Sequence, residues 1–207
     1  MFFHRPPTFV KHLYPSLTWS IPSTEKIIYL TFDDGPIPIL TEFILDSLEE
    51  HKVKATFFCV GDNLRKNNEI GRRAIEEGHQ LANHTFNHMN GWKTGNEMYF
   101  DNIYQCEHQL HHLDQNNKLF RPPYGKITRP QIKNIKKTHQ IVMWDVLTGD
   151  YSKSITPKEC LYNSIKSTKR GSIVLFHDNL KADKNVRYAL PRYIEHFLKK
   201  DYEFRLL

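Results

Sequence analysis

The sequence has few cysteines, no long apolar run and no cluster of charge of one sign, and each absence narrows the protein classes to which it can belong. The three cysteines are widely spaced and form no CxxC pair, which argues against a disulfide framework and a thiolate zinc cluster. No apolar run approaches the length of a membrane span. Charged residues and prolines interrupt residues 1–20, so this segment lacks the continuous apolar stretch of a signal peptide, and a cytoplasmic location is the default expectation.

Charge runs, internal repeats and low-complexity tracts are also absent. Lys and Arg number 29 against 23 Asp and Glu, a formal charge of +6, but the excess is spread along the chain. That distribution is typical of solvated helix faces and argues against nucleic acid as a partner. With 207 residues, 39% of them hydrophobic, the chain can bury a core without disulfide or oligomer support. We therefore expect a single domain over residues 1–207, with residues 1–24 as an N-terminal extension that packs on it.

The sequence does contain a regular alternation of apolar runs and amphipathic segments. Runs of apolar and β-branched residues predict about seven strands, at 27–32, 55–60, 80–83, 119–121, 141–144, 173–176 and 203–206. Segments with helical spacing lie between them, at 40–50, 69–77, 96–113, 129–138, 157–167 and 183–199. Strand followed by helix, repeated, indicates a parallel α/β sheet. With roughly seven such units in one domain, a closed or nearly closed barrel is favoured over an open doubly wound sheet, and no glycine-rich phosphate loop follows the first strand.

Unusual polar residues follow the carboxyl ends of several predicted strands. The first strand ends at Asp33 and Asp34, neighbours whose side chains would point to opposite faces unless the backbone twists at Gly35. Polar segments in the same position follow later strands, at His84, 121–124, 145–150 and His177. In α/β barrels this rim holds the active site, so residues far apart in the sequence are expected to converge on one mouth.

A metal site is one function that these residues could share. His84 and His88 have an HxxxH spacing, which would place both imidazoles on one side of a helical turn and within reach of a single ion. The same spacing at His108 and His112 lies inside a predicted helix and is better explained as a solvated helix face. Two histidines and a carboxylate are a known catalytic zinc set, which makes Asp34 the third predicted ligand. In the plainer alternative, Asp34 caps a helix and the two histidines are hydrogen-bonded loop residues.

Taken together, the polar segments resemble the motifs of the polysaccharide deacetylases of carbohydrate esterase family four, which share the NodB homology domain. The motifs appear in the family's order, as TFDDGP at 31–36, HTFNH at 84–88, RPPYG at 121–125, WDVLTGDY at 144–151 and IVLFHD at 173–178. The resemblance covers residues 27–207 and implies a distorted, incomplete (β/α) barrel, similar to a TIM barrel. It also implies an enzyme of carbohydrate metabolism that removes acetyl groups from sugars with a divalent metal, zinc first and cobalt or nickel as alternatives.

The resemblance assigns the central chemical roles by position in these motifs. Asp33 resembles the general base that takes a proton from water activated by the metal. Asp34, His84 and His88 resemble the metal ligands, and His177 resembles the general acid. The division is chemically sensible, because a divalent cation lowers the proton affinity of water and a nearby carboxylate completes the deprotonation.

Supporting roles are assigned in the same way. Arg121 resembles the arginine that pairs with the base, and Asp150 the carboxylate that pairs with the acid; the plainer readings are a surface ion pair and a helix cap. Tyr124 resembles the tyrosine whose backbone N–H stabilises the oxyanion. Leu175 would form an apolar wall for the acetyl methyl group, or simply belong to the core. Tyr151 stands where the family often carries tryptophan, so the aromatic platform beside the sugar is expected to be smaller.

The leading hypothesis is a metal-dependent hydrolase of carbon–nitrogen, non-peptide bonds that acts on N-acetylated sugars, such as an N-acetylglucosamine-type glycan or oligosaccharide. An O-acetyl ester hydrolase is one alternative, because the same chemistry attacks an ester at a lower barrier. A catalytically silent carbohydrate-binding barrel is another, since fold does not fix function. The sequence leaves the physiological glycan, the oligomeric state and the role of residues 1–24 open. We expect Asp145 to have a structural role and Asp178 to cap the following loop.

Overall fold

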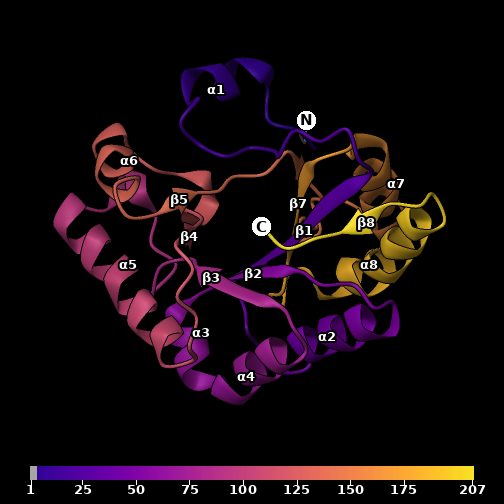
Figure 1. Cartoon of the computed structure of the whole chain (residues 1–207), viewed down its shortest axis with the longest axis horizontal. Coiled ribbons are helices and arrows are strands. Elements are labelled where there is room, and N and C mark those ends of the chain that lie inside the picture. The colour runs from indigo at the N-terminus through magenta and orange to yellow at the C-terminus, as the bar shows by residue number, and fades with distance from the viewer. Residues whose placement is uncertain (1–3) are drawn as a thin grey trace.

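A computed structural model describes residues 4–207, so the first three residues of the expected N-terminal extension lie outside the described part (Figure 1). The fold is a parallel β-sheet that curls into part of a barrel, with helices along its outside. The strands are β1 (Ile27–Asp33), β2 (Thr56–Cys59), β3 (Gln80–Asn83), β4 (Leu119–Phe120), β5 (Gln140–Ile141), β6 (Val146–Leu147), β7 (Ser172–His177) and β8 (Glu203–Phe204).

The order of the strands leaves the barrel incomplete. The sheet runs β5-β4-β3-β2-β1-β7-β6, and β8 pairs with β1 beside this path. Among the described residues no ladder joins β5 to β6, so the barrel stays open between these two strands. The expected distorted, incomplete (β/α) barrel is confirmed.

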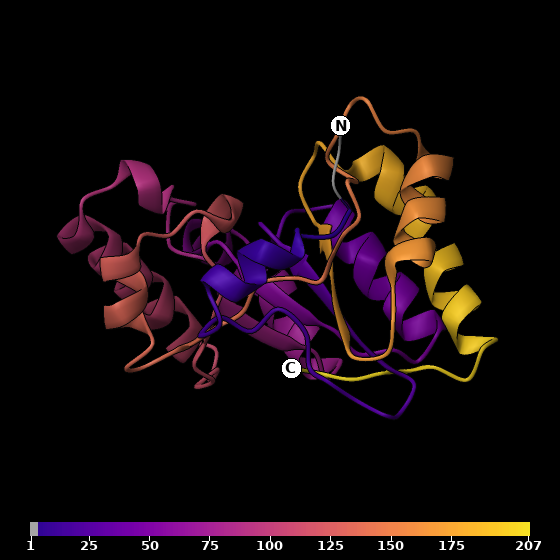
Figure 2. The same ribbon diagram turned by 90° about the horizontal axis from the view of Figure 1, so that it is seen from above.

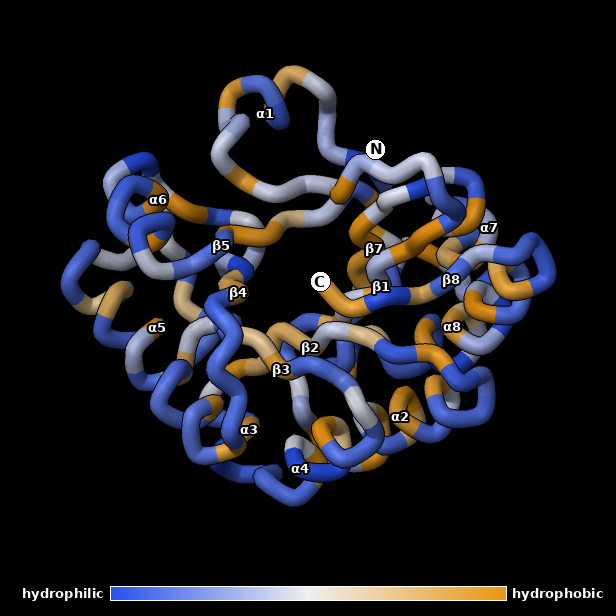
Figure 3. The backbone as a smooth tube through the Cα atoms, in the orientation of Figure 1, coloured by the Kyte–Doolittle hydropathy of each residue, from blue (hydrophilic) through white to orange (hydrophobic). Residues whose placement is uncertain are grey.

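Helices follow most strands and cover the outside of the sheet. They are α1 (Thr8–Leu13), α2 (Leu40–Glu50), α3 (Gly61–Lys66), α4 (Asn68–Glu76), α5 (Asn96–His111), α6 (Arg129–Ile135), α7 (Pro157–Ser167) and α8 (Asp183–Leu198), with short 3₁₀ turns η1 (Gly91–Lys93) and η2 (Pro123–Gly125). Local sequence fixes the start of α7, because the Thr156 side chain accepts the Glu159 N–H, Glu159 bonds back to the Thr156 N–H, and Pro157 occupies the first turn. The outer edge of the molecule is mostly hydrophilic (Figure 3).

Strand β1 lies at the centre of the core and is buried along its whole length. Alternate residues Ile28, Leu30 and Phe32 pack in the large cluster that includes α2 and α8, whereas Ile27 and Tyr29 pack among neighbouring strands inside the barrel. This period of two places Thr31 and Asp33 on the inner side as well. The sheet therefore delivers Asp33 to the mouth of the barrel by strand geometry alone.

The N-terminal segment lies at the opening of the barrel. Thr18 forms a parallel bridge with Val142, just after β5, and Ser20 forms an antiparallel bridge with Ser172 at the start of β7. Both ribbon views place α1 between α6 on one side and α7 on the other (Figures 1 and 2).

Most predicted elements are present, and the differences have identifiable causes. The predicted strand 141–144 was wrong in extent, because the chain changes partners there: β5 pairs with β4, the Met143 N–H donates to the Thr18 carbonyl, and β6 pairs with β7. Helices α1 and α3 were not predicted. The cysteines are buried and free. No helix within residues 4–207 combines the length and apolar character needed to cross a membrane.

Candidate active site

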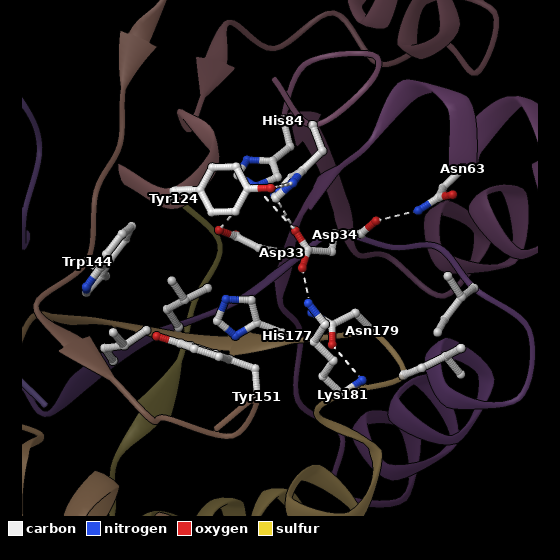
Figure 4. Close-up of a pocket in the computed structure, with 15 residues that line it drawn as sticks. Asp33, Asp34, Asn63, His84, Tyr124, Trp144, Tyr151, His177, Asn179 and Lys181 are labelled. Carbon is white, nitrogen blue, oxygen red and sulfur yellow. Dashed lines mark hydrogen bonds and ion pairs between the residues drawn. The ribbon is translucent and has the colours of Figure 1, made fainter. Parts of the chain in front are cut away.

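A cleft of about 640 Å³ opens at the carboxyl ends of the strands (Figure 4). Residues from separate motifs line it, among them Asp33, Asp34, His84, His88, Tyr124, Trp144, Leu147, Tyr151, Leu175 and His177. The structure therefore brings together residues that the sequence places more than a hundred positions apart. Arg121 and Asp150 lie behind this lining and are buried.

The backbone turns sharply after β1, so that both neighbouring carboxylates reach the cleft. Asp34 has a φ of 92°, a left-handed conformation that a non-glycine residue seldom adopts. The positive φ thus falls on Asp34 rather than on Gly35, whose peptide bond to Pro36 is cis. Gly35 is needed for a different reason, because a Cβ there would lie 1.7 Å from Oδ2 of Asp178.

Asp178 is bound to this turn. Its carboxylate accepts hydrogen bonds from the Gly35 N–H at 2.7 Å and from the Thr41 hydroxyl at 2.8 Å. Burial raises the pKa of Asp178 to about 8, although these two bonds act in the opposite direction. The expectation that Asp178 caps the following loop was therefore wrong, since it braces the turn that carries the carboxylates.

Asp34, His84 and His88 form a compact cluster. Each offers one ligand atom, and these atoms all lie within 4.8 Å of one another. Within residues 4–207 this is the one group of such side chains that could hold a metal ion. Nδ1 of His84 lies 2.7 Å from the Arg121 carbonyl and must donate to it, which leaves a lone pair on Nε2 toward the cluster. This donor set fits a divalent cation such as zinc.

Electrostatics favour the ionised form of Asp34. Its Oδ1 atom lies 2.9 Å from Nε2 of His88 and 3.6 Å from Nε2 of His84. Burial raises the pKa of this carboxyl, but the two imidazoles outweigh burial and hold the pKa well below its usual value. A carboxylate in this state is ready to bind a cation.

Arg121 fixes the second carboxylate, Asp33. Its guanidinium is fully buried and donates to Oδ1 of Asp33 at 2.6 Å and to the Thr31 hydroxyl at 2.9 Å. It also donates to the carbonyls of Val142 and Met143. The alternative of a surface ion pair is excluded by this burial, and the Asp33 carboxylate has one preferred orientation.

His177 and Asp150 form a second buried pair opposite Asp33. Nδ1 of His177 lies 2.9 Å from Oδ1 of Asp150, and the His177 backbone N–H donates to Oδ2 at 2.6 Å. Burial lowers the pKa of His177, but the Asp150 charge and hydrogen bond outweigh it and raise the pKa to about 9. Because Asp150 occupies Nδ1, the Nε2 atom is the nitrogen left for the cleft.

Aromatic and apolar side chains complete the lining. The Tyr124 ring packs edge-on against His88 with centroids 4.5 Å apart, and its hydroxyl lies 3.1 Å from Nδ1 of His88. Tyr151 packs against the His177 ring at 4.8 Å. Leu175 lines the cleft and is almost fully buried, so it serves the core and the cleft wall at once.

Comparison with known proteins identifies the family that shares this arrangement. The sequence profile of the family described as polysaccharide deacetylase matches residues 20–143. The chain belongs to the polysaccharide deacetylase family. A peptidoglycan-N-acetylglucosamine deacetylase of Bacillus cereus is 33% identical over 198 residues, 94% of this chain and 93% of that protein. A chitooligosaccharide deacetylase of Azorhizobium caulinodans is 33% identical and covers 79% of each chain.

Solved structures agree with this assignment. The crystal structure of the Bc1960 peptidoglycan N-acetylglucosamine deacetylase superposes with a TM-score of 0.89 at 34% identity, covering 96% of this chain and 94% of that chain. The match extends over nearly the whole chain, which is thus a polysaccharide deacetylase.

One local expectation for this polysaccharide deacetylase was wrong. The HxxxH segment is a loop rather than a helical turn, because Thr85 and His88 have φ values of 64° and 55°. The loop brings the two imidazoles together by left-handed residues instead of helical spacing. The other HxxxH pair lies on a solvated helix face as expected, since His108 and His112 are both exposed at the end of α5.

Sequence reasoning missed two asparagines that hold Asp34 in this deacetylase. Nδ2 of Asn179 donates to Oδ2 of Asp34 at 2.6 Å, and Nδ2 of Asn63 donates to the Asp34 carbonyl at 2.7 Å. Oδ1 of Asn179 accepts from the backbone N–H groups of Lys181 and Ala182, which fixes the orientation of its amide. The only signal in the sequence was that Asn179 directly follows the fifth motif.

Proposed function

We propose that this deacetylase removes N-acetyl groups from an N-acetylglucosamine-type glycan or oligosaccharide in a metal-dependent hydrolysis. The observation that carries the proposal is the placement of Asp33 and His177 on neighbouring strands beside the Asp34, His84 and His88 cluster. The names of the relatives, a peptidoglycan-N-acetylglucosamine deacetylase and a chitooligosaccharide deacetylase, support the choice of an N-acetylated sugar.

Asp34, His84 and His88 are the residues that would hold the cation, zinc first and cobalt or nickel as alternatives. The two imidazoles and the ionised carboxylate suit it, and the His84 tautomer already presents a lone pair. When bound, the cation supplies Lewis-acid activation of water and of the substrate carbonyl.

The protein's own groups then move the protons. Asp33, held by Arg121, takes a proton from the attacking water as the oxygen–carbon bond forms. The backbone N–H of Tyr124 donates to the carbonyl oxygen as it gains negative charge. Nε2 of His177 gives a proton to the sugar nitrogen as the carbon–nitrogen bond breaks. The acetic acid formed passes its proton to the amine, so the products are acetate and a protonated amino sugar; exchange of one proton through solvent returns Asp33 to its ionised form and His177 to its protonated form, and atoms and protons balance.

Other side chains orient the acetamide. Leu175 offers an apolar surface to the acetyl methyl group, and Tyr151 and Trp144 offer aromatic faces or edges to the sugar ring. The presence of base, acid and ligand set in one cleft argues against a silent carbohydrate-binding barrel.

Acetate release from a panel of glycans tests the proposal. The panel contains chitooligosaccharides, peptidoglycan and O-acetylated xylan, each assayed after chelation and after return of zinc, cobalt or nickel. We expect release from the N-acetylated substrates, its loss on chelation and its recovery with metal. Release of acetate from xylan alone would instead favour an ester hydrolase. Full activity after complete chelation would contradict the proposed dependence on a metal ion.

The contact from Asn179 to Asp34 predicts an effect on metal affinity. We expect Asn179→Ala to weaken metal binding about tenfold to a hundredfold, because the donor that orients the ligand carboxylate is lost. Competition with a chromophoric chelator measures this below the melting temperature, since the variant also loses the helix-start contacts of Asn179. Asn116→Ala, at an exposed site, is the control, and equal affinities in the two variants would refute the prediction.

The pair of Asp150 and His177 predicts a change in pH dependence. His177 must be protonated to act as an acid, so activity should fall as pH rises through its pKa of about 9. Asp150→Asn removes the charge that raises this pKa, and we expect the alkaline limb to move down by about one to three pH units. The exposed Asp201→Asn is the control for the charge change. The pH profile of kcat/KM measures the shift, and an unmoved alkaline limb would contradict it.

A further inference from the structure

Asp145 is a buried carboxylate that the proposed reaction does not use. It follows Trp144, a cleft residue, and is only 3% exposed. Nη2 of Arg5 donates to its two oxygens at 2.6 and 2.7 Å, and Nζ of Lys11 donates to Oδ1 at 2.5 Å. The Ser172 hydroxyl donates to Oδ2 at 2.7 Å. Both cations that neutralise Asp145 therefore come from the N-terminal segment.

A second contact joins the same two parts of the chain. The Leu147 N–H donates to the His4 carbonyl at 2.8 Å, and Nδ1 of His4 lies 2.9 Å from the Leu147 carbonyl, to which it must donate. His4 thus holds both backbone groups of a residue whose side chain lines the cleft. We call residues 4–20 the N-terminal strap and residues 144–151 the cleft wall.

The strap also supplies neighbours where the sheet has none. Between β5 and β6 the chain crosses the opening of the barrel, and there the Thr18 N–H donates to the Ile141 carbonyl at 2.9 Å and the Met143 N–H to the Thr18 carbonyl at 2.7 Å. The strap lies across this opening in both ribbon views (Figures 1 and 2). Without it, the segment that leads into the cleft wall would lose these hydrogen bonds.

The Asp145 carboxylate needs the two strap cations because it is buried. A buried carboxylate is costly unless it is paired, and among residues 4–207 the Asp145 side chain keeps only the Ser172 hydroxyl if Arg5 and Lys11 are removed. Burial raises the pKa of Asp145, yet the bonds from Arg5, Lys11 and Ser172 outweigh burial and keep the carboxyl ionised. The arrangement in which the cleft wall contacts the strap is therefore favoured, because it is the one in which Asp145 is paired.

We propose that the N-terminal strap positions the cleft wall for catalysis. Arg5 and Lys11 act through Asp145, and His4 acts through Leu147. Together they set the place of Trp144 and Leu147 against the substrate and of Asp150 behind the acid histidine. These are positioning residues, because none of them lies in the cleft lining itself. The kinetic part of this inference rests on the proposed deacetylation.

The test compares two double variants of equal charge change in the full chain. Arg5→Ala/Lys11→Ala removes both strap cations, whereas Lys133→Ala/Lys158→Ala removes two exposed cations from α6 and α7. We expect the first variant to raise KM and lower kcat/KM for a chitooligosaccharide by about tenfold to a hundredfold, since small misplacements are costly in catalysis. Metal affinity should stay unchanged, because the ligands lie elsewhere. The control variant should behave as the unmodified protein does.

Hydrogen–deuterium exchange gives a readout that does not depend on turnover. Peptides spanning 144–151 should exchange at least about tenfold faster in Arg5→Ala/Lys11→Ala, because the amide of Leu147 loses its acceptor when the strap departs. Arg5→Lys/Lys11→Arg, which keeps both charges, should restore slow exchange and normal KM. If the amides of residues 144–151 exchange faster in Arg5→Ala/Lys11→Ala but the unmodified protein releases no acetate, the positioning by the strap is supported and the proposed deacetylation is refuted. Unchanged exchange and kinetics, even with a lower melting temperature, would reduce the strap to a stabilising role and overturn the inference.

Discussion

Asp33→Asn is expected to lower kcat by about 10²-fold to 10⁴-fold while the metal still binds. The substitution removes the carboxylate that accepts a proton from the attacking water, but it leaves the three ligand side chains in place. The asparagine oxygen can still accept the bond from Arg121, so the fold should survive. Steady-state acetate release at saturating metal measures kcat, and competition with a chelator measures metal affinity in the same preparation.

The matched control for this variant is Asp46→Asn, which removes an exposed carboxylate that pairs with Arg73. Its kcat should match that of the unmodified protein. A kcat for Asp33→Asn within tenfold of normal would exclude Asp33 as the general base. Loss of both turnover and metal would instead indicate that Asp33 belongs to the metal site.

His88→Ala is expected to weaken metal binding by more than about a hundredfold and to abolish acetate release at ordinary metal concentrations. His88 supplies one of the three ligand atoms, and its side chain is 26% exposed at the rim, so the core should tolerate the truncation. The release of acetate should return in part at high metal concentration, because Asp34 and His84 remain.

The chain offers a close control for this experiment. His108→Ala truncates a histidine of the other HxxxH pair, on α5 and away from the cleft. It should change neither metal affinity nor turnover. If His108→Ala reduced metal binding as much as His88→Ala, the ion would lie elsewhere and the proposed ligand set would be refuted.

Local signals made much of the fold predictable from the sequence. Helices α2 and α7 begin and end where the sequence predicts, because amphipathic spacing and, for α7, a capping box with proline act within a few residues. The predicted strand 141–144 failed because residues 140–147 change partners from β4 to β7 midway. No local pattern encodes such an exchange, since the partners lie far away in the chain.

In the candidate site, too, local features could be predicted from the sequence and contacts between distant residues could not. The rim positions of Asp33, Asp34 and His177 could be predicted because each lies at the end of an apolar strand or directly after it, whereas their chemical roles were predicted from the resemblance to the family motifs. The loop form of the HxxxH segment could not, since a left-handed Thr85 leaves no mark in residue spacing. Contacts such as Arg5 to Asp145 and Asn179 to Asp34 join residues 140 and 145 positions apart, so only the folded chain reveals them.

The pairing of β1 with β7 sets Asp33 directly opposite His177 in the strand register. Backbone hydrogen bonds hold adjacent strands about 4.8 Å apart. The sheet therefore fixes the separation between Asp33 and His177, the two residues to which we assign proton transfer. The residues expected to meet the sugar, by contrast, come largely from loops. Grafting loops from relatives with other glycan preferences should therefore alter selectivity while preserving the acid–base geometry, which makes this scaffold a suitable starting point for engineering.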